Sequence, residues 1–169
     1  MDAYVVEEGG VADLGLLEPM WLAVHHQHQR AMPHLRPYVD DATSWQEHRL
    51  VYEELYAEHD PVLLLARGGD DLAGYALGYT MPAGGTWLSD TWATGDVIGE
   101  VETLSVLPEH RGRGLGSRLL EQLHERLREQ GARDVLLGAL AGNADALRLY
   151  ERHGYRPTWL YLTRLDGRD

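Results

Sequence analysis

A glycine-rich turn flanked by arginines is the stretch whose chemistry follows most directly from its residues. From Val101 to Gly116 the chain reads Val-Glu-Thr-Leu-Ser-Val-Leu-Pro-Glu-His-Arg-Gly-Arg-Gly-Leu-Gly, a β-prone run followed by a turn and a helix start. In such a strand–turn–helix unit, the backbone N–H groups of the turn and the partial positive charge of the helix N-terminus favour an anion. Arg111 and Arg113 add guanidinium groups that suit phosphate oxygens. The stretch therefore predicts a phosphate site.

Other motifs compete for this turn. A dinucleotide fingerprint needs the spacing G-x-G-x-x-G, whereas the glycines here follow G-x-G-x-G. A Walker phosphate loop needs Gly-Lys-Ser/Thr, and the chain contains no lysine. A tight turn that only starts a helix remains as the alternative without a ligand.

Two carboxylates precede the turn. With a strand period of two, Glu100 and Glu102 share one face with Leu104 and Val106, and the two glutamates lie about 7 Å apart. Such a pair could hold a cationic substrate and take its proton through water. The alternative is that one or both are solvated strand residues.

The composition predicts a single domain over residues 1–169, with 44% hydrophobic and 25% charged residues as in ordinary soluble proteins. We find no membrane-length apolar run and no signal peptide, and we expect a cytoplasmic protein. The absence of cysteine excludes disulfides, thiolate metal sites and a cysteine nucleophile. The net charge of −12 argues against a nucleic-acid partner and favours a cationic one, such as an amine.

Hydrophobic periodicity and turn signals predict a mixed α/β fold of about six strands and four helices around the turn. The strand–helix–strand unit implies that the strand after the turn's helix pairs in parallel with the strand near residue 104. Ser44 and Glu47 form a capping-box signature for the second helix, whose apolar side is Leu50, Tyr52, Leu55 and Tyr56. In the first half of the chain we expect strand 3–7, helices 11–31 and 44–59, and strands 61–66 and 72–80 in a hairpin. An irregular insertion 81–96, the central strand, helix 114–130, strand 134–140, helix 143–154 and strand 158–165 follow. In helix 143–154 we expect Asn143 as the N-cap and Ala146, Leu147 and Tyr150 to be buried.

Histidines and aromatic residues outside the turn are further candidates for a site. His25, His26 and His28 lack a carboxylate at ligand spacing, so we expect a solvated helix end and no metal site. The insertion carries Trp87 and Trp92, which favours the wall of a pocket over a disordered loop. For Trp159 and Tyr161 we expect core or interface positions.

Two motifs in order resemble those of the GCN5-related N-acetyltransferases (GNAT), a superfamily of acetyl-CoA-dependent amine acetyltransferases. The stretch from Arg111 to Gly116 matches the signature R/Q-x-x-G-x-G/A, and Val106-Leu107-Pro108-Glu109-His110 is similar to the usual lead-in. Downstream, Asn143 is followed seven residues later by Tyr150 and then by the pair Gly154-Tyr155, as in the second motif. The resemblance covers about residues 97–157 and implies a GNAT-like fold whose central sheet is splayed where acetyl-CoA inserts.

The resemblance also implies roles for individual residues. The amides of the turn would hold the pyrophosphate of CoA, the backbone of Leu104 and Val106 would pair with the pantetheine arm, and Asn143 would contact the same arm. The Leu104 N–H would polarise the thioester carbonyl, and Tyr150 would protonate the departing thiolate. The implied cofactor-binding set is Leu104, Val106, Arg111, Gly112, Arg113, Gly114, Leu115, Gly116, Ser117, Asn143 and Tyr150.

On the acceptor side, Glu102 matches the glutamate of polyamine-type members and Glu100 that of histone-type members, and we rank Glu102 first as the base. Tyr38, Trp87 and Trp92 could line the acceptor pocket, with core packing as the alternative. The implied function is direct acetyl transfer to a primary amine of a small cationic molecule. The alternatives are a protein or peptide amine as acceptor, a non-catalytic CoA-binding module, and an acyl-CoA hydrolase or a transferase to an alcohol.

The end of the chain departs from the family pattern. Members usually end with two strands after the Gly-aromatic pair, but only 15 residues follow Gly154. Either the last pair is abbreviated or a second subunit completes the edge of the sheet. We therefore expect a homodimer.

Overall fold

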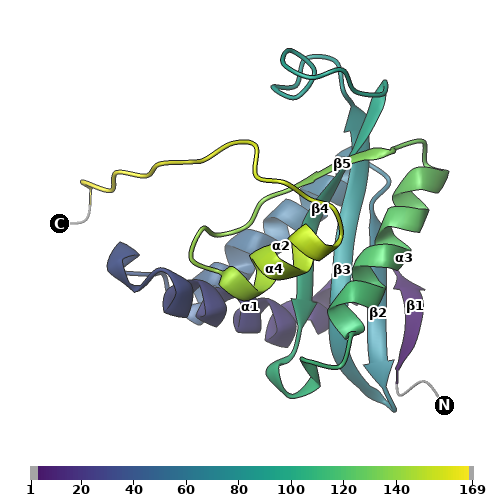
Figure 1. Ribbon diagram of the computed structural model, residues 1–169. Helices are drawn as coiled ribbons and strands as arrows, with labels where there is room; N and C mark the ends of the chain where they lie inside the picture. The colour runs from purple at the N-terminus through teal and green to yellow at the C-terminus, as the bar shows by residue number, and fades with distance from the viewer. Residues whose placement is uncertain (1–3, 168–169) are drawn as a thin grey trace.

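A mixed five-stranded sheet organises the fold in the computed structural model, which describes residues 4–167 (Figure 1). Its first four strands pair antiparallel, and the fifth runs parallel to the fourth. This confirms the mixed α/β class, with five strands where about six were expected. In spatial order the strands are β1 (Val5–Gly9), β2 (Val62–Gly68), β3 (Asp71–Pro82), β4 (Val97–Val106) and β5 (Asp134–Leu137).

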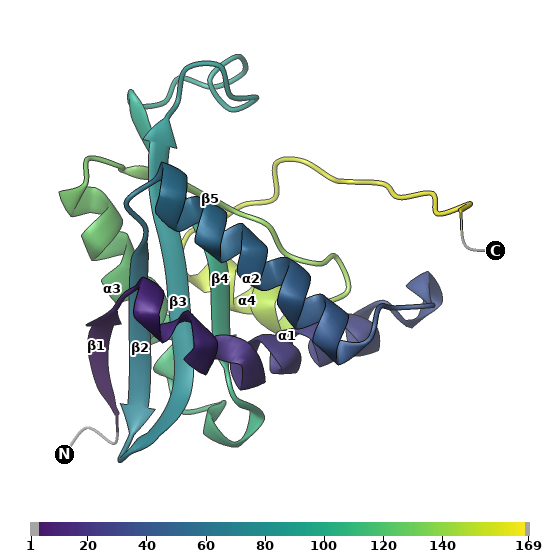
Figure 2. The same cartoon turned by 180° about the vertical axis from the view of Figure 1, so that it is seen from behind.

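Helices cover both faces of the sheet (Figures 1 and 2). On one face lie α1 (Glu18–Ala31), with the preceding 3-10 turn η1 (Val11–Leu17), and α2 (Asp41–Glu58). On the other face lie α3 (Leu115–Glu129) and α4 (Ala144–Arg152). Two short 3-10 turns, η2 (Pro33–Leu35) and η3 (Pro108–His110), follow α1 and β4. The helices expected around the glycine turn and after Asn143 are thus present.

Strand β2 shows why this sheet needs helices on both sides. Its residues Val62, Leu64 and Ala66 belong to the core under α3, while Leu63 and Leu65 belong to the core under α1 and α2. Successive side chains of a strand point to opposite faces, so a strand covered on both faces is apolar at every position. The continuous apolar run that predicted a buried strand follows from this arrangement.

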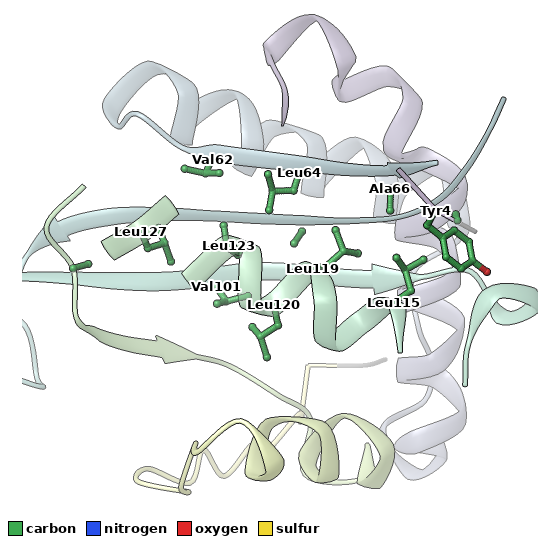
Figure 3. Close-up of a cluster of buried hydrophobic side chains, with 13 residues drawn as sticks. Tyr4, Val62, Leu64, Ala66, Val101, Leu115, Leu119, Leu120, Leu123 and Leu127 are labelled. Atoms are coloured by element: carbon green, nitrogen blue, oxygen red, sulfur yellow. The ribbon is translucent and has the colours of Figure 1, made fainter. Parts of the chain in front are cut away.

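Helix α3 packs its predicted leucine stripe onto the sheet (Figure 3). The stripe recurs every three to four residues, which puts its members on one side of a helix. Burying each leucine side chain contributes about 1.5–3 kcal/mol. This helix therefore holds the glycine turn at its N-terminus firmly against the sheet. The five buried residues are Leu115, Leu119, Leu120, Leu123 and Leu127.

The predicted start of α2 was wrong. The helix begins at Asp41, and the Asp40 carboxylate caps it by accepting a hydrogen bond from the Thr43 N–H at 2.8 Å. Ser44 is buried instead, and its hydroxyl accepts a hydrogen bond from the Trp21 indole at 3.0 Å. An aspartate cap available four residues earlier displaced the capping box, because either side chain can satisfy the free N–H groups of the first turn. Leu50, expected on the apolar side, is exposed.

The expected strand 158–165 was wrong, because residues 155–167 form no strand. Of the core or interface positions expected for Trp159 and Tyr161, the core is wrong, since both residues are exposed. This segment runs away from the body of the molecule (yellow in Figure 1). In α4, Ala146, Leu147 and Tyr150 are half-buried, because this helix borders an open cleft. A run of β-prone residues becomes a strand only where a partner edge accepts its hydrogen bonds.

Candidate active site

The cleft opens where β4 and β5 part. These strands pair only from Ile98 to Val101 in β4, opposite Asp134 to Leu137 in β5. The expected parallel pairing with the central strand is confirmed, but it stops at Val101 because β5 ends after four residues. Beside the second half of β4 lies a cleft of ≈ 1500 Å³ that is lined by the strand, the glycine turn and α4. The splay of the sheet therefore creates the site.

A β-bulge at Glu102 sets the direction of the side chains in β4. Thr103 pairs with Leu77 and Val101 with Gly78, so Glu102 has no partner position in β3. The bulge adds one residue and breaks the period of two. Leu104 and Val106 consequently pack on the α3 side, whereas Glu100 contacts Tyr79, which packs on the side of α1 and α2. The expectation that Glu100 shares a face with Leu104 and Val106 was wrong.

The same geometry presents backbone groups to the cleft. The Leu107 N–H donates to the Ala73 carbonyl at 2.9 Å, so this residue is bonded toward β3. The backbone N–H and C=O groups of successive strand residues point alternately to the two neighbouring strands. Since those of Leu107 point to β3, those of Leu104 and Val106 differ: they point away from β3, toward the cleft. There the Val106 carbonyl accepts a hydrogen bond from Arg111 Nε at 2.8 Å. Leu104 and Val106 both line the cleft.

The glycine turn adopts backbone conformations that favour glycine. Gly112 and Gly114 have φ values of 72° and 79°, in the left-handed region, and Gly114 is the N-cap of α3. The turn therefore faces the cleft with the N-terminus of α3, as an anion site requires. The residues of the turn that line the cleft are Arg111, Gly112, Gly114, Leu115, Gly116 and Ser117.

Arg113 is placed differently from Arg111. Its guanidinium donates to the Tyr4 hydroxyl at 3.4 Å, and it is not among the described residues that line the cleft. Tyr4 also contacts His110 at 3.1 Å, and its backbone carbonyl accepts from Arg118 at 3.0 Å. Tyr4 thus braces both sides of the turn. Sequence reasoning missed this residue because more than 100 positions separate it from the turn.

Asn143 and Tyr150 reach the cleft from α4. The Asn143 side chain caps the helix by accepting from the Ala146 N–H at 3.4 Å, as predicted. Gly142 packs directly on the Ala31 carbonyl, where a Cβ atom would clash, so the start of α4 lies against the end of α1. Burial raises the pKa of Tyr150 to about 12. Its hydroxyl therefore stays protonated at neutral pH and can serve as a proton donor.

The two glutamates occupy different surroundings. Glu102 lines the cleft, and burial, followed by the charge of Glu100, raises its pKa above that of an ordinary carboxyl group. Glu100 accepts a hydrogen bond from the Tyr79 hydroxyl at 2.8 Å and is not among the described residues that line the cleft. A raised pKa makes a carboxylate a stronger base. The geometry therefore favours Glu102 over Glu100 for proton transfer.

Sequence reasoning missed the part of the cleft formed by α1 and α2. Trp21 and His48 stack with ring centroids 3.3 Å apart, and His28 meets the Trp21 ring edge-to-face at 6.2 Å. All three residues line the cleft. Burial, helped by His28, lowers the pKa of His48 to about 4, so His48 is neutral at pH 7. A tryptophan and a histidine that lie 27 positions apart have no motif spacing that could have signalled this pair.

The three aromatic residues expected in the acceptor pocket separate into two groups. Trp87 and Trp92 line the cleft, together with Trp159 from the C-terminal segment. Tyr38 is not among the described residues that line it. Its hydroxyl donates to the Met32 carbonyl at 2.6 Å and thereby fixes the chain after α1.

The histidines of α1 are held by the protein itself, so the expected solvated helix end was wrong. His25 is buried with its Nε2 3.1 Å from the Val39 carbonyl, and His26 contacts the Asp41 carboxylate at 2.9 Å. Within residues 4–167, no group of three or more His, Cys, Asp or Glu residues could hold a metal ion. Over the same residues, no helix is both long enough and apolar enough to cross a membrane.

A mixed sheet whose strands β4 and β5 part beside a glycine turn defines a class of α/β domain, and the free N–H groups at the start of α3 favour an anion. Comparison with known sequences names the family. The chain belongs to the acetyltransferase (GNAT) family, whose sequence pattern matches residues 21–155. The resemblance noted in the two motifs is confirmed.

Individual relatives cover parts of the chain. It is 39% identical over 67 residues to an aminoalkylphosphonate N-acetyltransferase of Salmonella typhimurium, covering 40% of this chain and 44% of the relative. It is 30% identical over 120 residues to a thialysine N-epsilon-acetyltransferase of Sus scrofa, covering 71% of this chain and 59% of the relative. The chain thus spans less than two thirds of the length of these relatives.

Solved structures match the whole fold. A putative acetyl transferase from Pyrococcus furiosus has a TM-score of 0.75 at 18% identity, covering 96% of this chain and 99% of that chain. A predicted acetyltransferase with acetyl-CoA from Clostridium acetobutylicum has a TM-score of 0.68 at 18% identity, covering 98% and 99%. At this identity the likeness establishes the fold.

Proposed function

We propose that this protein is an N-acetyltransferase that uses acetyl-CoA to acetylate a primary amine of a cationic small molecule. The observation that carries the proposal is the open edge of β4. There the backbone of Leu104 and Val106 faces the cleft and leads directly into the turn that starts α3. An extended ligand with a phosphate end and a chain of amides matches this edge, because amides pair with a strand and phosphate pairs with a helix N-terminus.

The chain's residues fit acetyl-CoA as the co-substrate. The turn from Arg111 to Ser117 would hold the pyrophosphate through backbone N–H groups, with Arg111 as the one arginine of the pair that lines the cleft. Leu104 and Val106 would bond the pantetheine arm, and Asn143 would contact it from α4. The solved relative from Clostridium acetobutylicum that carries acetyl-CoA in its title supports this choice.

The proposed chemistry assigns one proton transfer to each side of the cleft. Glu102 takes a proton from the ammonium group of the acceptor, so that the nitrogen can form a bond to the thioester carbon. The Leu104 N–H donates to the carbonyl oxygen on which negative charge develops. Tyr150 gives its proton to the sulfur as the carbon–sulfur bond breaks, and its high pKa keeps that proton available at neutral pH. The nitrogen loses its second proton as the tetrahedral intermediate collapses, and this proton restores the Tyr150 hydroxyl through water.

A cationic acceptor is supported by the charge of the chain and by the cleft. The net charge is −12, and Glu102 lines the cleft, as does the neutral His48. The relatives named above acetylate amines according to their names, which range from an aminoalkylphosphonate to thialysine. A protein or peptide amine remains the second candidate acceptor, since another relative is named for the ribosomal protein bS18 of Escherichia coli.

The test is release of thiol from acetyl-CoA across a panel of amines. We expect release that depends on one class of amine and that falls strongly in both Glu102→Gln and Tyr150→Phe. Binding of acetyl-CoA without release by any amine would contradict the enzyme and favour a CoA-binding module on this fold. Failure to bind acetyl-CoA would contradict the assignment of the turn.

We also propose that the protein forms a homodimer through its C-terminal segment. Leu160, Tyr161 and Leu162 are 71%, 85% and 88% exposed, which is unfavourable for three consecutive large apolar residues. Strand β5 lies at the edge of the sheet in one chain. The hydrogen-bonding groups on its outer side can therefore pair with the C-terminal segment of a second copy. Sedimentation should give a dimer for the full chain and a monomer after truncation at Trp159; a full chain that stays monomeric would contradict the proposal.

A further inference from the structure

Three tryptophans meet at the mouth of the cleft, and the proposed acetyl transfer uses none of them. Trp87 and Trp92 come from the loop between β3 and β4, and Trp159 comes from the C-terminal segment, which passes near this loop (Figure 1). The ring centroids lie 6.0, 5.8 and 6.4 Å apart, with interplanar angles of 82°, 90° and 80°. We refer to Trp87, Trp92 and Trp159 as the tryptophan cage.

The arrangement suits a cation. Three mutually perpendicular rings at nearly equal spacing can form the three faces at the corner of a box. In a box corner with these spacings, one point would face all three rings at about 4 Å from each centroid, inside the ~6 Å range of a cation–π contact. Residues Trp87, Trp92 and Trp159 are 37%, 41% and 56% exposed, and all three line the cleft, so a ligand in the cleft can reach them.

The charges around the cage favour a positive ligand as well. The loop between β3 and β4 carries Asp90 and Asp96 and no basic residue. The arginines nearest to Trp159 in the chain are engaged elsewhere: Arg156 donates to the Tyr155 carbonyl at 2.8 Å, and Arg164 pairs with Asp166 at 2.5 Å. Neither arginine therefore needs the cage as its partner.

The position of the cage along β4 indicates which part of an acceptor it would meet. The loop precedes β4 and the glycine turn follows it, so the ten residues of the strand separate the two by about 30 Å. Glu102 lies between them. A molecule whose primary amine reaches Glu102 could extend its other end toward the cage.

We propose that the tryptophan cage binds an alkylammonium group, such as a trimethylammonium, at the far end of the acceptor. The role in acetyl transfer rests on the proposed function, but the binding of the cation does not. The ring faces attract the positive charge of the ligand. The apolar surface of the same rings favours alkyl groups on the nitrogen. This narrows the acceptor class to elongated amines with a second cationic group.

Binding tests the cage without acetyl-CoA. Choline and 3,3-dimethylbutan-1-ol have the same shape, but only choline is charged, and binding can be followed through the indole NMR signals. We expect choline to bind at least fivefold more tightly than the alcohol. Trp159→Ala should abolish this preference, and Trp159→Phe should retain part of it. Leu165→Ala should leave it unchanged, because Leu165 is exposed and is not among the described residues that line the cleft. Equal binding of the two probes, binding of neither, or a preference that survives Trp159→Ala would overturn the proposal.

Acetyl transfer then separates the cage from the proposed function. Two acceptors are compared, each with the same primary amine and linker, one ending in a trimethylammonium group and the other in a tert-butyl group. We expect the charged acceptor to have at least a fivefold higher kcat/KM in the natural chain and a similar value to the neutral one in Trp159→Ala. If both are acetylated equally in the natural chain, the cage has no part in acceptor choice while the acetyltransferase stands. If choline binds as expected but no amine releases thiol, the proposed function fails and the cation site stands.

Discussion

The two ends of the cleft are built in different ways. At the proposed cofactor end, β4, the glycine turn and the start of α3 follow one another within residues 97–117, so neighbours in sequence are neighbours in space. At the acceptor end, side chains come from α1, α2, the loop between β3 and β4, and the C-terminal segment. The cofactor end is therefore local, and the acceptor end exists only once the chain has folded.

Because the two ends are built differently, substitutions at each end should have different kinetic effects. The cofactor end offers mainly backbone groups, which every acceptor would share. The acceptor end offers side chains, including a stacked tryptophan and histidine and three tryptophans at the mouth. Changes at the first end should alter acetyl-CoA kinetics alike for all amines, and changes at the second should depend on the amine.

The largest expected effect lies where the two ends meet. Tyr150→Phe should lower kcat about 100-fold, the size typical of a lost proton donor, and raise the KM for acetyl-CoA much less. Tyr155→Phe is the matched control, because Tyr155 packs 5.8 Å from Tyr150 and bonds His124 instead. A rise in KM with little change in kcat for Tyr150→Phe would make Tyr150 a binding residue.

The pH profile distinguishes the two glutamates. Because its pKa is raised, Glu102 takes up a proton at a higher pH than an ordinary carboxyl group does. Below that pKa, kcat/KM should fall about tenfold per pH unit, because the protonated group cannot act as the base. Glu102→Gln should remove this acidic limb along with most of the activity, while Glu100→Gln should keep it. If the acidic limb of the pH profile disappeared only in Glu100→Gln, Glu100 and not Glu102 would be the base.

A pair of glycines tests the cofactor end. Gly114 and Gly131 both have positive φ, 79° and 99°, and in both cases an added Cβ meets no atom within 4 Å. Alanine at either position should cost about 1–2 kcal/mol of stability, as measured by denaturant unfolding. Only Gly114→Ala should raise the KM for acetyl-CoA, by about tenfold, since Gly131 ends α3 away from the turn. Equal acetyl-CoA kinetics in both variants would contradict an anion site at the turn.

The smallest expected effect concerns the acceptor end. Since the folded-state pKa of His48 is lowered to about 4, the unfolded chain binds more protons between about pH 4 and 6.5. Stability should therefore fall as pH drops through this range, by on the order of 1 kcal/mol for this half-buried group. His48→Gln should flatten this part of the stability profile, whereas the exposed His34→Gln should leave it unchanged. An unaltered profile in His48→Gln would mean that His48 is not held neutral.

The sequence by itself determined the features that depend on short-range order. The leucine stripe of α3, the Asn143 cap and the glycine turn each follow from residues within about one or two helical turns, because hydrogen bonds and side-chain periodicity act over that range. The succession of strands along the chain, up to β5, also followed from local patterns. These features were enough to indicate the family.

Only the tertiary structure decided the features that depend on partners far away in the chain. The bulge at Glu102 arises from pairing with β3 and moved the two glutamates relative to Leu104. The early end of β5 opened the cleft. Trp21 reached His48, and Trp159 reached the loop of Trp87, across long stretches of chain. The expected last strand failed to form because a strand needs an edge that accepts its hydrogen bonds, and a pattern of residues does not contain that edge.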